Sequence, residues 1–256
     1  MGIENTGKLK NLLDVWPPQT VATSAWLHEQ KVSAQLAQRY VRSHWIEPLG
    51  TGAFKRPNEK VEWFGAVRSL QTQLDLTVHI GALTALSAQG FSHYLRIGQE
   101  PVYLFSPPDT RLPSWFTGYD WKVPIHHVKS SLLPENVGLT RHAYGSLDVT
   151  ISAPERAILE CLHLSPKRFD LIESYELLQG LLNLRPKLMQ ELLEVCNSIK
   201  VKRLFLYMAA KASLPVIKHL NLDTIDLGKG DRSLAKDGLY VSKYALNLPK
   251  ELVNHD

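Results

Sequence analysis

The sequence predicts an α+β protein with a small N-terminal head, residues 1–60, and a larger mixed α/β body, residues 61–256. Two observations favour this class. Apolar residues recur at helical spacing in two separate series, near the N-terminus and between residues 152 and 212, and short runs typical of strands lie between and after them. Because the helices are grouped and do not alternate with strands, a regular α/β fold is not expected. The sequence does not mark the boundary between head and body sharply, and a head that extends to about residue 95 fits the pattern as well.

The head is expected to begin with a lead-in helix over residues 1–16, ended by Pro17-Pro18. A second, shorter helix should follow, with an apolar stripe formed by Val21, Ala22, Ala25, Trp26 and Leu27. Residues 29–32 are typical of a turn that joins two such helices. A third helix is predicted from Ser33, whose hydroxyl can accept a hydrogen bond from a free amide of the first turn, to Ser43.

The third helix has two distinct faces. The packing face carries Leu36, Ala37, Tyr40 and Val41. The opposite face carries four polar side chains at spacing i, i+3, i+4 and i+7: Gln35, Gln38, Arg39 and Arg42. Glutamine can pair bidentately with adenine and arginine with guanine in the major groove. The exposed face is therefore suited to reading base edges.

A β-hairpin is predicted directly after this helix. Residues 45–49 and 53–56 flank Gly50-Thr51-Gly52, which supplies the permissive backbone of a tight turn. Pro48 cannot donate to a sheet ladder, so its strand must lie at an edge or contain a bulge. Lys55 and Arg56 are expected to face phosphate. The order of these elements predicts a winged helix-turn-helix, whose DNA-binding residues are expected to be Ser33, Gln35, Gln38, Arg39, Arg42, Thr51, Lys55 and Arg56.

The charge of the chain is concentrated in the head. Residues 31–60 hold six lysines and arginines against two glutamates, a net charge of +4, which equals the formal charge of the whole chain. Such a concentration is typical of a phosphate-binding surface. An alternative remains open, in which the basic face is only solvated and the head is a protein-interaction or RNA-binding module. A stand-alone winged-helix regulator is a further alternative, and an isolated gene would favour either that regulator or the protein- or RNA-interaction module, here called the adaptor interpretation.

The body is expected to contain grouped helices and short strands. Its strands are predicted at residues 77–80, 102–105, 125–128 and 147–151, and its extended tail pieces at 224–227, 232–235 and 244–248. Ser152 and Glu155 fit a capping box that would open a helix to Leu164. Arg156, in the same turn, is expected to form an internal ion pair. The remaining helices are predicted at residues 62–74, 82–89, 171–182, 186–196 and 199–212.

The last of these helices also has a basic side. Val201, Leu204, Phe205 and Met208 form its apolar stripe, and Lys200, Lys202, Arg203 and Lys211 are expected to face solvent. This basic face could engage nucleic acid, although a merely solvated helix is the plainer alternative.

Several classes of function are not expected. A hydrophobic content of 44% with 21% charged residues is typical of an ordinary globular chain, and no apolar run reaches the ~20 residues of a membrane span. With no signal peptide in the sequence, the expected location is the cytoplasm. Cys161 and Cys196 are isolated and should be buried free thiols.

No enzymatic, cofactor or metal site is expected either. Six of the ten histidines lie between His79 and His163, but no carboxylate recurs beside them at the spacing of a ligand set. Gly145-Ser146 with Asp148 faintly resembles a nucleotidyltransferase motif, yet the second aspartate that would hold metal is missing.

The chain resembles the AbiEi family of type IV antitoxins over nearly its whole length. The matching stretches are residues 32–40 (VSAQLAQRY), 45–57 (WIEPLGTGAFKRP), 81–86 (GALTAL), 152–160 (SAPERAILE) and 185–193 (RPKLMQELL). The resemblance implies an autorepressor whose head binds operator DNA, expected to contain inverted repeats upstream of its own gene. It also implies a body concerned with antitoxicity against a nucleotidyltransferase-like toxin, with no stable complex between the two, and a role in phage defence. Under this interpretation the basic face of residues 199–212 is the candidate surface for antitoxicity.

Overall fold

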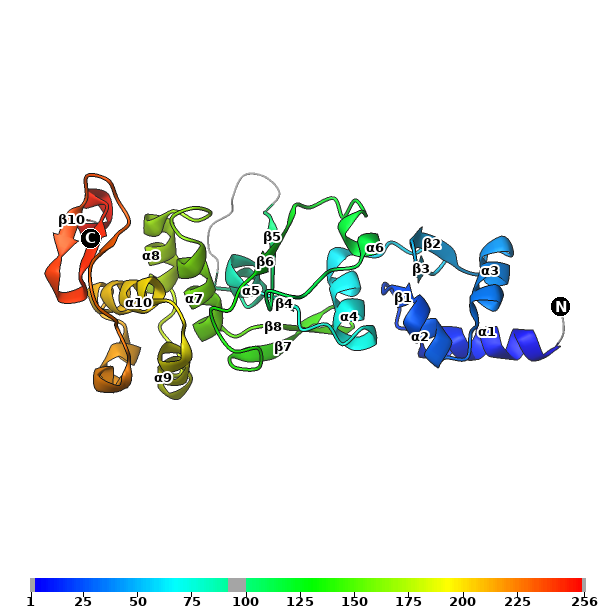
Figure 1. Cartoon of the computed structure of the whole chain (residues 1–256). Coiled ribbons are helices and arrows are strands. Elements are labelled where there is room, and N and C mark those ends of the chain that lie inside the picture. The colour runs from blue at the N-terminus through cyan, green and yellow to red at the C-terminus, as the bar shows by residue number, and fades with distance from the viewer. Residues whose placement is uncertain (1–2, 92–99, 255–256) are drawn as a thin grey trace.

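The computed structural model describes residues 3–91 and 100–254, and its elements lie along one long axis (Figure 1). The head is at one end and the C-terminal tail, residues 213–254, is at the other. Between them, the body contains a five-stranded sheet followed by a group of helices. The α+β class predicted from the grouping of the helices is confirmed.

The head is a winged helix-turn-helix. Its elements are α1 (Ile3–Val15), β1 (Ala22–Thr23), α2 (Ser24–Glu29), α3 (Ala34–Arg42), β2 (Glu47–Gly50) and β3 (Ala53–Lys55). The three strands pair antiparallel in the order β1-β3-β2. The predicted lead-in helix, second helix of the pair and glycine-tipped hairpin are all present.

The first helix of the helix-turn-helix begins later than expected. Residues 21–23 were predicted to be helical, but Ala22 lies opposite Phe54 as part of β1. The helix starts after Thr23, whose side chain accepts a hydrogen bond from the amide of Trp26 at 3.2 Å. The apolar run therefore splits, because its first residues are needed to complete the small sheet.

Pro48 occupies the position that its missing amide predicts. Strand β2 lies at the edge of the sheet, and the register between β2 and β3 shifts between Pro48 and Gly50. Gly52 has a φ of +77°, which glycine adopts without strain, and this allows the chain to turn back into β3.

The body contains a mixed sheet in the order β6-β5-β4-β8-β7. Its elements are α4 (Trp63–Gln73), β4 (His79–Ile80), α5 (Ala82–Ala88), β5 (Val102–Ser106), α6 (Ser114–Thr117), β6 (Ile125–Lys129), β7 (Leu139–Tyr144) and β8 (Leu147–Ser152). Strand β7 was not predicted. Its residues alternate between partly buried and exposed, so it lacks the apolar run that marked the other strands. Gly145-Ser146, considered above as a remnant of a transferase motif, is the two-residue turn between β7 and β8.

Four helices and the tail complete the body. The helices are α7 (Pro154–Leu164), α8 (Leu171–Gln179), α9 (Pro186–Val195) and α10 (Ile199–Lys211), as predicted to within a few residues. The tail contains η1 (Pro215–His219), η2 (Leu222–Thr224), β9 (Arg232–Ser233), β10 (Leu239–Val241), η3 (Ser242–Tyr244), β11 (Leu246–Leu248) and α11 (Lys250–Asn254). Its strands form a second small sheet in the order β10-β11-β9. Strand β10 was not predicted, and residues 224–227 are not a strand.

The predicted capping box of α7 is absent. The cap position is Ala153, and the Ser152 hydroxyl instead donates to Glu160 at 2.8 Å. Glu155 accepts hydrogen bonds from the backbone amide of Arg185 at 2.7 Å and from its guanidinium at 2.9 and 3.0 Å. The two capping side chains are thus used in tertiary contacts, which local spacing does not reveal.

The head is docked tightly on the body. The Ser69 hydroxyl of α4 accepts from the amide of Val21 at 3.1 Å and donates to its carbonyl at 2.8 Å. A Cβ added to Gly50 would lie 2.9 Å from the Cβ of Trp115 in α6. Val21 and Ala53 belong to the same apolar cluster as the body core. The head and the body therefore share packed contacts at α4 and α6.

Candidate DNA-binding face and buried charges of the body

Helix α3 presents the predicted reading face to solvent. Its first turn is fixed by Ser33, whose hydroxyl accepts from the amide of Leu36 at 3.3 Å. Ala37 and Tyr40 are buried on the packing side, and Leu36 and Val41 are half-buried. The side chains of the reading face, Gln35, Gln38, Arg39 and Arg42, are all exposed. Because the apolar side of α3 packs against α1 and α2, its polar side faces solvent.

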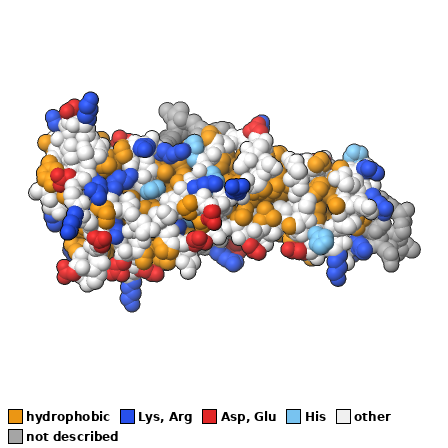
Figure 2. Space-filling view, in the orientation of Figure 1, with side chains coloured by type: hydrophobic (Ala, Val, Ile, Leu, Met, Phe, Trp, Pro, Cys, Tyr) orange, Lys and Arg blue, Asp and Glu red, His pale blue; other side chains and the backbone are white. Residues whose placement is uncertain are grey.

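The arginines of this face are free to bind a ligand. Within residues 3–91 and 100–254, neither Arg39 nor Arg42 forms an ion pair or a side-chain hydrogen bond with another part of the chain. Thr51 is exposed at the tip of the hairpin. Lysine and arginine side chains are visible at both ends of the molecule, including the surface of the head (Figure 2). The face thus combines exposed amide and guanidinium groups, the types of side chain that can pair with base edges.

Lys55 and Arg56 do not have the expected orientation. The Lys55 ammonium lies 2.7 Å from a carboxylate oxygen of Glu47 and donates to the carbonyl of Glu59 at 3.2 Å. The side-chain hydrogen bond from Lys55 holds the pKa of Glu47 below its ordinary value. This ammonium therefore fastens β3 to β2 and to the following turn, and it does not project toward a phosphate.

Arg56 closes the end of α1. Its guanidinium donates to the carbonyl of Leu13 at 2.7 Å and also to the carbonyl of Trp16. It lies over the Trp16 ring, 5.7 Å from the ring centroid. A cation that satisfies the free carbonyls at a helix C-terminus is favourable, which explains the inward orientation.

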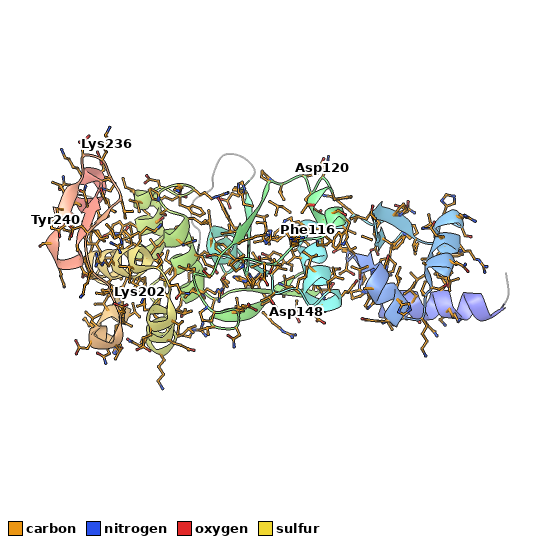
Figure 3. All side chains as sticks on the ribbon, in the orientation of Figure 1. Phe116, Asp120, Asp148, Lys202, Lys236 and Tyr240 are labelled. Atoms are coloured by element: carbon orange, nitrogen blue, oxygen red, sulfur yellow. The ribbon has the colours of Figure 1, made fainter. Side chains whose placement is uncertain are left out.

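Most of the basic side of α10 is covered, which corrects the predicted solvent exposure of Lys200, Lys202, Arg203 and Lys211: Lys202 and Arg203 are buried, and Lys200 and Lys211 are half-buried. Lys202 is only 3% exposed and Arg203 only 4%. Lys202, labelled on α10 in Figure 3, donates to the carbonyl of Asp226 at 2.9 Å. Lys211 donates to the carbonyl of Val253 at 3.1 Å, and Lys200 to the carbonyls of His163 and Ser165 at 2.9 and 2.6 Å.

Arg203 is the main anchor of the tail. Its guanidinium donates to four backbone carbonyls, those of Leu227, Gly228, Gly230 and Ala245, at 2.8, 3.1, 2.6 and 3.2 Å. Arginine offers five donors in a fixed planar arrangement, so one side chain can hold several segments of irregular backbone. The basic stripe of α10 is therefore a structural element beneath the tail.

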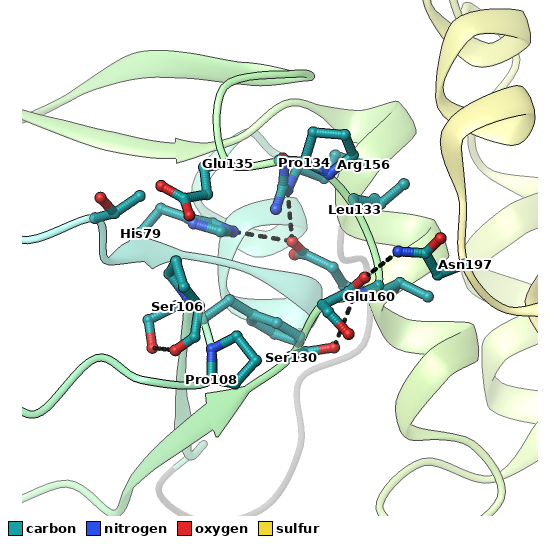
Figure 4. A pocket seen from close by; sticks show the side chains of 15 residues that line it. His79, Ser106, Pro108, Ser130, Leu133, Pro134, Glu135, Arg156, Glu160 and Asn197 are labelled. Carbon is teal, nitrogen blue, oxygen red and sulfur yellow. Dashed lines mark hydrogen bonds and ion pairs between the residues drawn. The ribbon is translucent and has the colours of Figure 1, made fainter.

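A second set of buried charges joins α7 to the sheet (Figure 4). Glu160 accepts from Arg156 Nε at 2.8 Å, from the amide of Ala82 at 2.9 Å, and lies 2.9 Å from His79 Nε2. The predicted internal ion pair of Arg156 is confirmed. Burial alone would raise the pKa of Glu160, but the charges of His79 and Arg156 and the hydrogen bonds outweigh burial and lower it to about 2.

These residues border a cavity of about 240 Å³ between β4, β5 and α7. Sequence reasoning did not predict Glu160 or His79 as members of one cluster. The spacing i, i+4 between Arg156 and Glu160 was a usable signal. By contrast, His79 lies 81 residues before Glu160 in the chain and no local pattern joins them. The carboxylate is fully engaged by protein donors, so the cluster fits a structural role.

The described residues contain neither a candidate metal site nor a helix that could span a membrane. In the two described ranges, no group of three or more histidine, cysteine or acidic side chains could hold a metal ion, and His93 lies outside those ranges. No helix within those ranges is both long and apolar enough to cross a bilayer. Cys161 and Cys196 are both buried and form no disulfide bond within the described residues, as predicted.

The fold is similar to that of a solved structure. A crystal structure of the Rv2827c protein from Mycobacterium tuberculosis aligns with a TM-score of 0.60 over 98% of this chain and 92% of that chain. The sequence identity is 13%, so the similarity establishes a shared fold. No curated protein matches the chain.

Comparison with protein families accounts for both parts of the molecule. Residues 5–97 match the model of the N-terminal domain of the transcriptional regulator AbiEi antitoxin. Residues 99–249 match the model described as "Transcriptional regulator, AbiEi antitoxin, Type IV TA system". This description is of a regulator and antitoxin and not of an enzyme. The chain belongs to the AbiEi family of antitoxin transcriptional regulators of type IV toxin–antitoxin systems.

Proposed function

We propose that the regulator binds operator DNA upstream of its own gene by placing α3 in the major groove. The observation that carries this proposal is the free, solvent-exposed face of Gln35, Gln38, Arg39 and Arg42 on a helix whose other side is buried. An exposed helix face of amide and guanidinium groups matches the donor and acceptor pattern of purine edges. A regulator acting on its own operon would work in the cytoplasm.

The roles within this face differ. Arg39 and Arg42 would contact guanine, and Gln35 and Gln38 adenine. Ser33 and Thr51 would contact phosphate on either side, at the start of α3 and at the tip of the wing. Lys55 and Arg56 are not assigned to phosphate, because both already hold protein partners. Inverted repeats in the operator would match two copies of the head.

A DNA titration tests this assignment. The upstream region of the gene should bind more tightly than a scrambled duplex of the same length and composition. Replacing Arg39 with alanine should cost about 1–3 kcal/mol of operator binding and relax the preference at one base pair. Lys187→Ala, which removes an exposed cation from α9, is the matched control and should leave the affinity unchanged. Equal binding of both duplexes by the unaltered protein would favour the adaptor interpretation instead.

We further propose that the cognate toxin is nucleotidyltransferase-like and is opposed without a stable complex. The family match supports an antitoxin role, and the identity of the toxin is inferred from resemblance. The experiment should use the full chain, because removing the head would uncover Ser69 and Trp115, which contact it. Co-expression with the neighbouring toxin should restore growth for both the unaltered chain and Arg39→Ala. Growth arrest with Arg39→Ala would show that neutralisation needs the DNA-binding face.

A further inference from the structure

A groove in the body is lined by four cations and by no acidic side chain among the described residues. It lies between the segment after α7, the start of α10 and the segment after β9, and its volume is about 790 Å³. The cations are Lys167, Arg168, Lys200 and Lys236. Lysine and arginine side chains gather over this part of the molecule (Figure 2), and Lys236 lies at the outer edge of the tail (Figure 3).

The positive charges of this groove are not neutralised within the protein. None of the four cations has an ion pair inside residues 3–91 and 100–254, and Lys167, Arg168 and Lys236 are exposed. Asp170, the nearest acidic residue after Arg168 in the chain, caps α8 by accepting from the amide of Ile172 at 2.7 Å. Cations that converge without a counter-charge repel one another unless an anion joins them.

Lys200 is held in place at the floor of the groove. Its ammonium donates to the carbonyls of His163 and Ser165 at 2.9 and 2.6 Å, which leaves one of its three donors for a ligand. Burial and then the charge of Lys167 lower the pKa of Lys200, and burial and then Lys200 lower that of His163. The same groove includes Ser198, the N-cap of the 13-residue helix α10, whose first amides have no partner within the helix.

We propose that this groove binds a small ligand that carries two or more contiguous phosphates, such as the phosphate chain of a nucleotide. Four cations from three chain segments and a helix start converge on one site, which suits a compact polyanion. The volume falls within the range of small-molecule sites. Among the described residues, no phenylalanine, tyrosine or tryptophan lines the groove, and His163 is its one aromatic ring, so phosphate and not the base would dominate recognition. The site is separate from the operator face, because α10 and α3 lie at opposite ends of the molecule (Figure 1).

Calorimetric titration of the full-length protein tests the site. Affinity should rise from AMP to ADP to ATP, be similar for ATP and GTP, and fall as salt is added, because the contacts are with phosphate. The double variant Lys167→Ala/Arg168→Ala should weaken ATP binding about tenfold or more, since it removes two charge-assisted contacts to phosphate. Both side chains are exposed, so the variant should fold, and its unfolding curve will verify that.

Two controls separate this site from a general effect of charge and from the head. Lys187→Ala/Lys218→Ala removes two exposed cations elsewhere on the body and should leave ATP binding intact. Arg39→Ala should weaken operator binding and leave ATP binding unchanged. The proposal is overturned if the full-length protein does not bind ATP, or if both double variants bind it equally well. An eight-nucleotide single strand that binds through Lys167 and Arg168 where ATP does not would also overturn it, in favour of a phosphodiester site.

Discussion

Helices α3 and α10 have the same sequence pattern and opposite environments. Each has an apolar stripe on one side and lysine, arginine or glutamine on the other. In α3 the polar side faces solvent, whereas in α10 Lys202 and Arg203 are buried beneath the tail. The sequence pattern therefore identifies the apolar side of a helix, which packs on the core. Whether the polar side stays exposed depends on a segment elsewhere in the chain, which for α10 is the tail. Only an uncovered basic face can serve as a binding surface.

The largest expected effect comes from removing the buried cation of α10. Arg203→Ala should lower the free energy of unfolding by about 3 kcal/mol or more, because a buried guanidinium that donates to four backbone carbonyls of the tail is removed. Arg39→Ala, on the exposed face of α3, should change it by no more than about 0.5 kcal/mol. Urea unfolding of the two variants measures the contrast. Equal stabilities would mean that the tail does not depend on α10.

Acid should destabilise the body through Glu160. Because its pKa is lowered to about 2, the ionised carboxylate stabilises the fold fully at pH values above its unfolded pKa, and this contribution is lost as the pH falls toward 2. A shift of this size corresponds to roughly 3 kcal/mol. The unfolding free energies of the unaltered protein and of Glu160→Gln should therefore approach each other as the pH falls from 4.5 to about 2. A constant difference across that range would contradict this assignment.

Substitutions at the contact between the head and the body should destabilise the protein more than substitutions on the exposed surface of either part. Gly50→Ala should destabilise the protein by about 1–2 kcal/mol, because the new Cβ would meet Trp115 and push the wing away from α6. Gly7→Ala, in α1, adds a methyl group to open space and should not destabilise the protein. Thermal unfolding of both variants would show the difference. An unchanged Gly50→Ala protein would indicate that the wing can shift freely.

The smallest expected effect is that of Lys55. Lys55→Ala should cost less than about 1 kcal/mol in stability, since its pair with Glu47 is partly exposed. Because its ammonium is already bound, the salt dependence of operator binding should stay unchanged, whereas loss of a phosphate contact would reduce the slope by about one. If the affinity of Lys55→Ala for the operator depended less steeply on salt concentration, Lys55 would have to be counted as a phosphate contact.

Local signals were sufficient to predict the head. Ser33 marks the start of α3, and the glycines at 50 and 52 mark the hairpin, each within a few residues of the feature that it specifies. Pro48 even fixed the edge position of its strand. What failed in the head were the start of α2 and the directions of Lys55 and Arg56. The carbonyl partners of Arg56 lie about forty residues earlier in the chain.

The body depended more on distant partners, and there the sequence was less informative. The cover of Lys202 and Arg203 comes from residues 226–245, whose irregular backbone has no periodic pattern. The cluster of Glu160 needs His79 from another strand. Strand β7 was missed because no apolar run marks it and because it takes its order from pairing with β8. Most elements were thus predictable, whereas most contacts between them were not.

The hydrogen bonds from Arg203 to the tail do not depend on the side chains of the tail. All four of its acceptors are backbone carbonyls, which every residue type provides. Side chains in this part of the tail can therefore be exchanged during evolution without loss of the anchor. The exceptions should be Gly228 and Gly230, whose φ angles of +60° and +72° set the path of the backbone past the guanidinium. Arg203 thus fixes the path of the tail backbone and at the same time leaves most of its side chains free to vary.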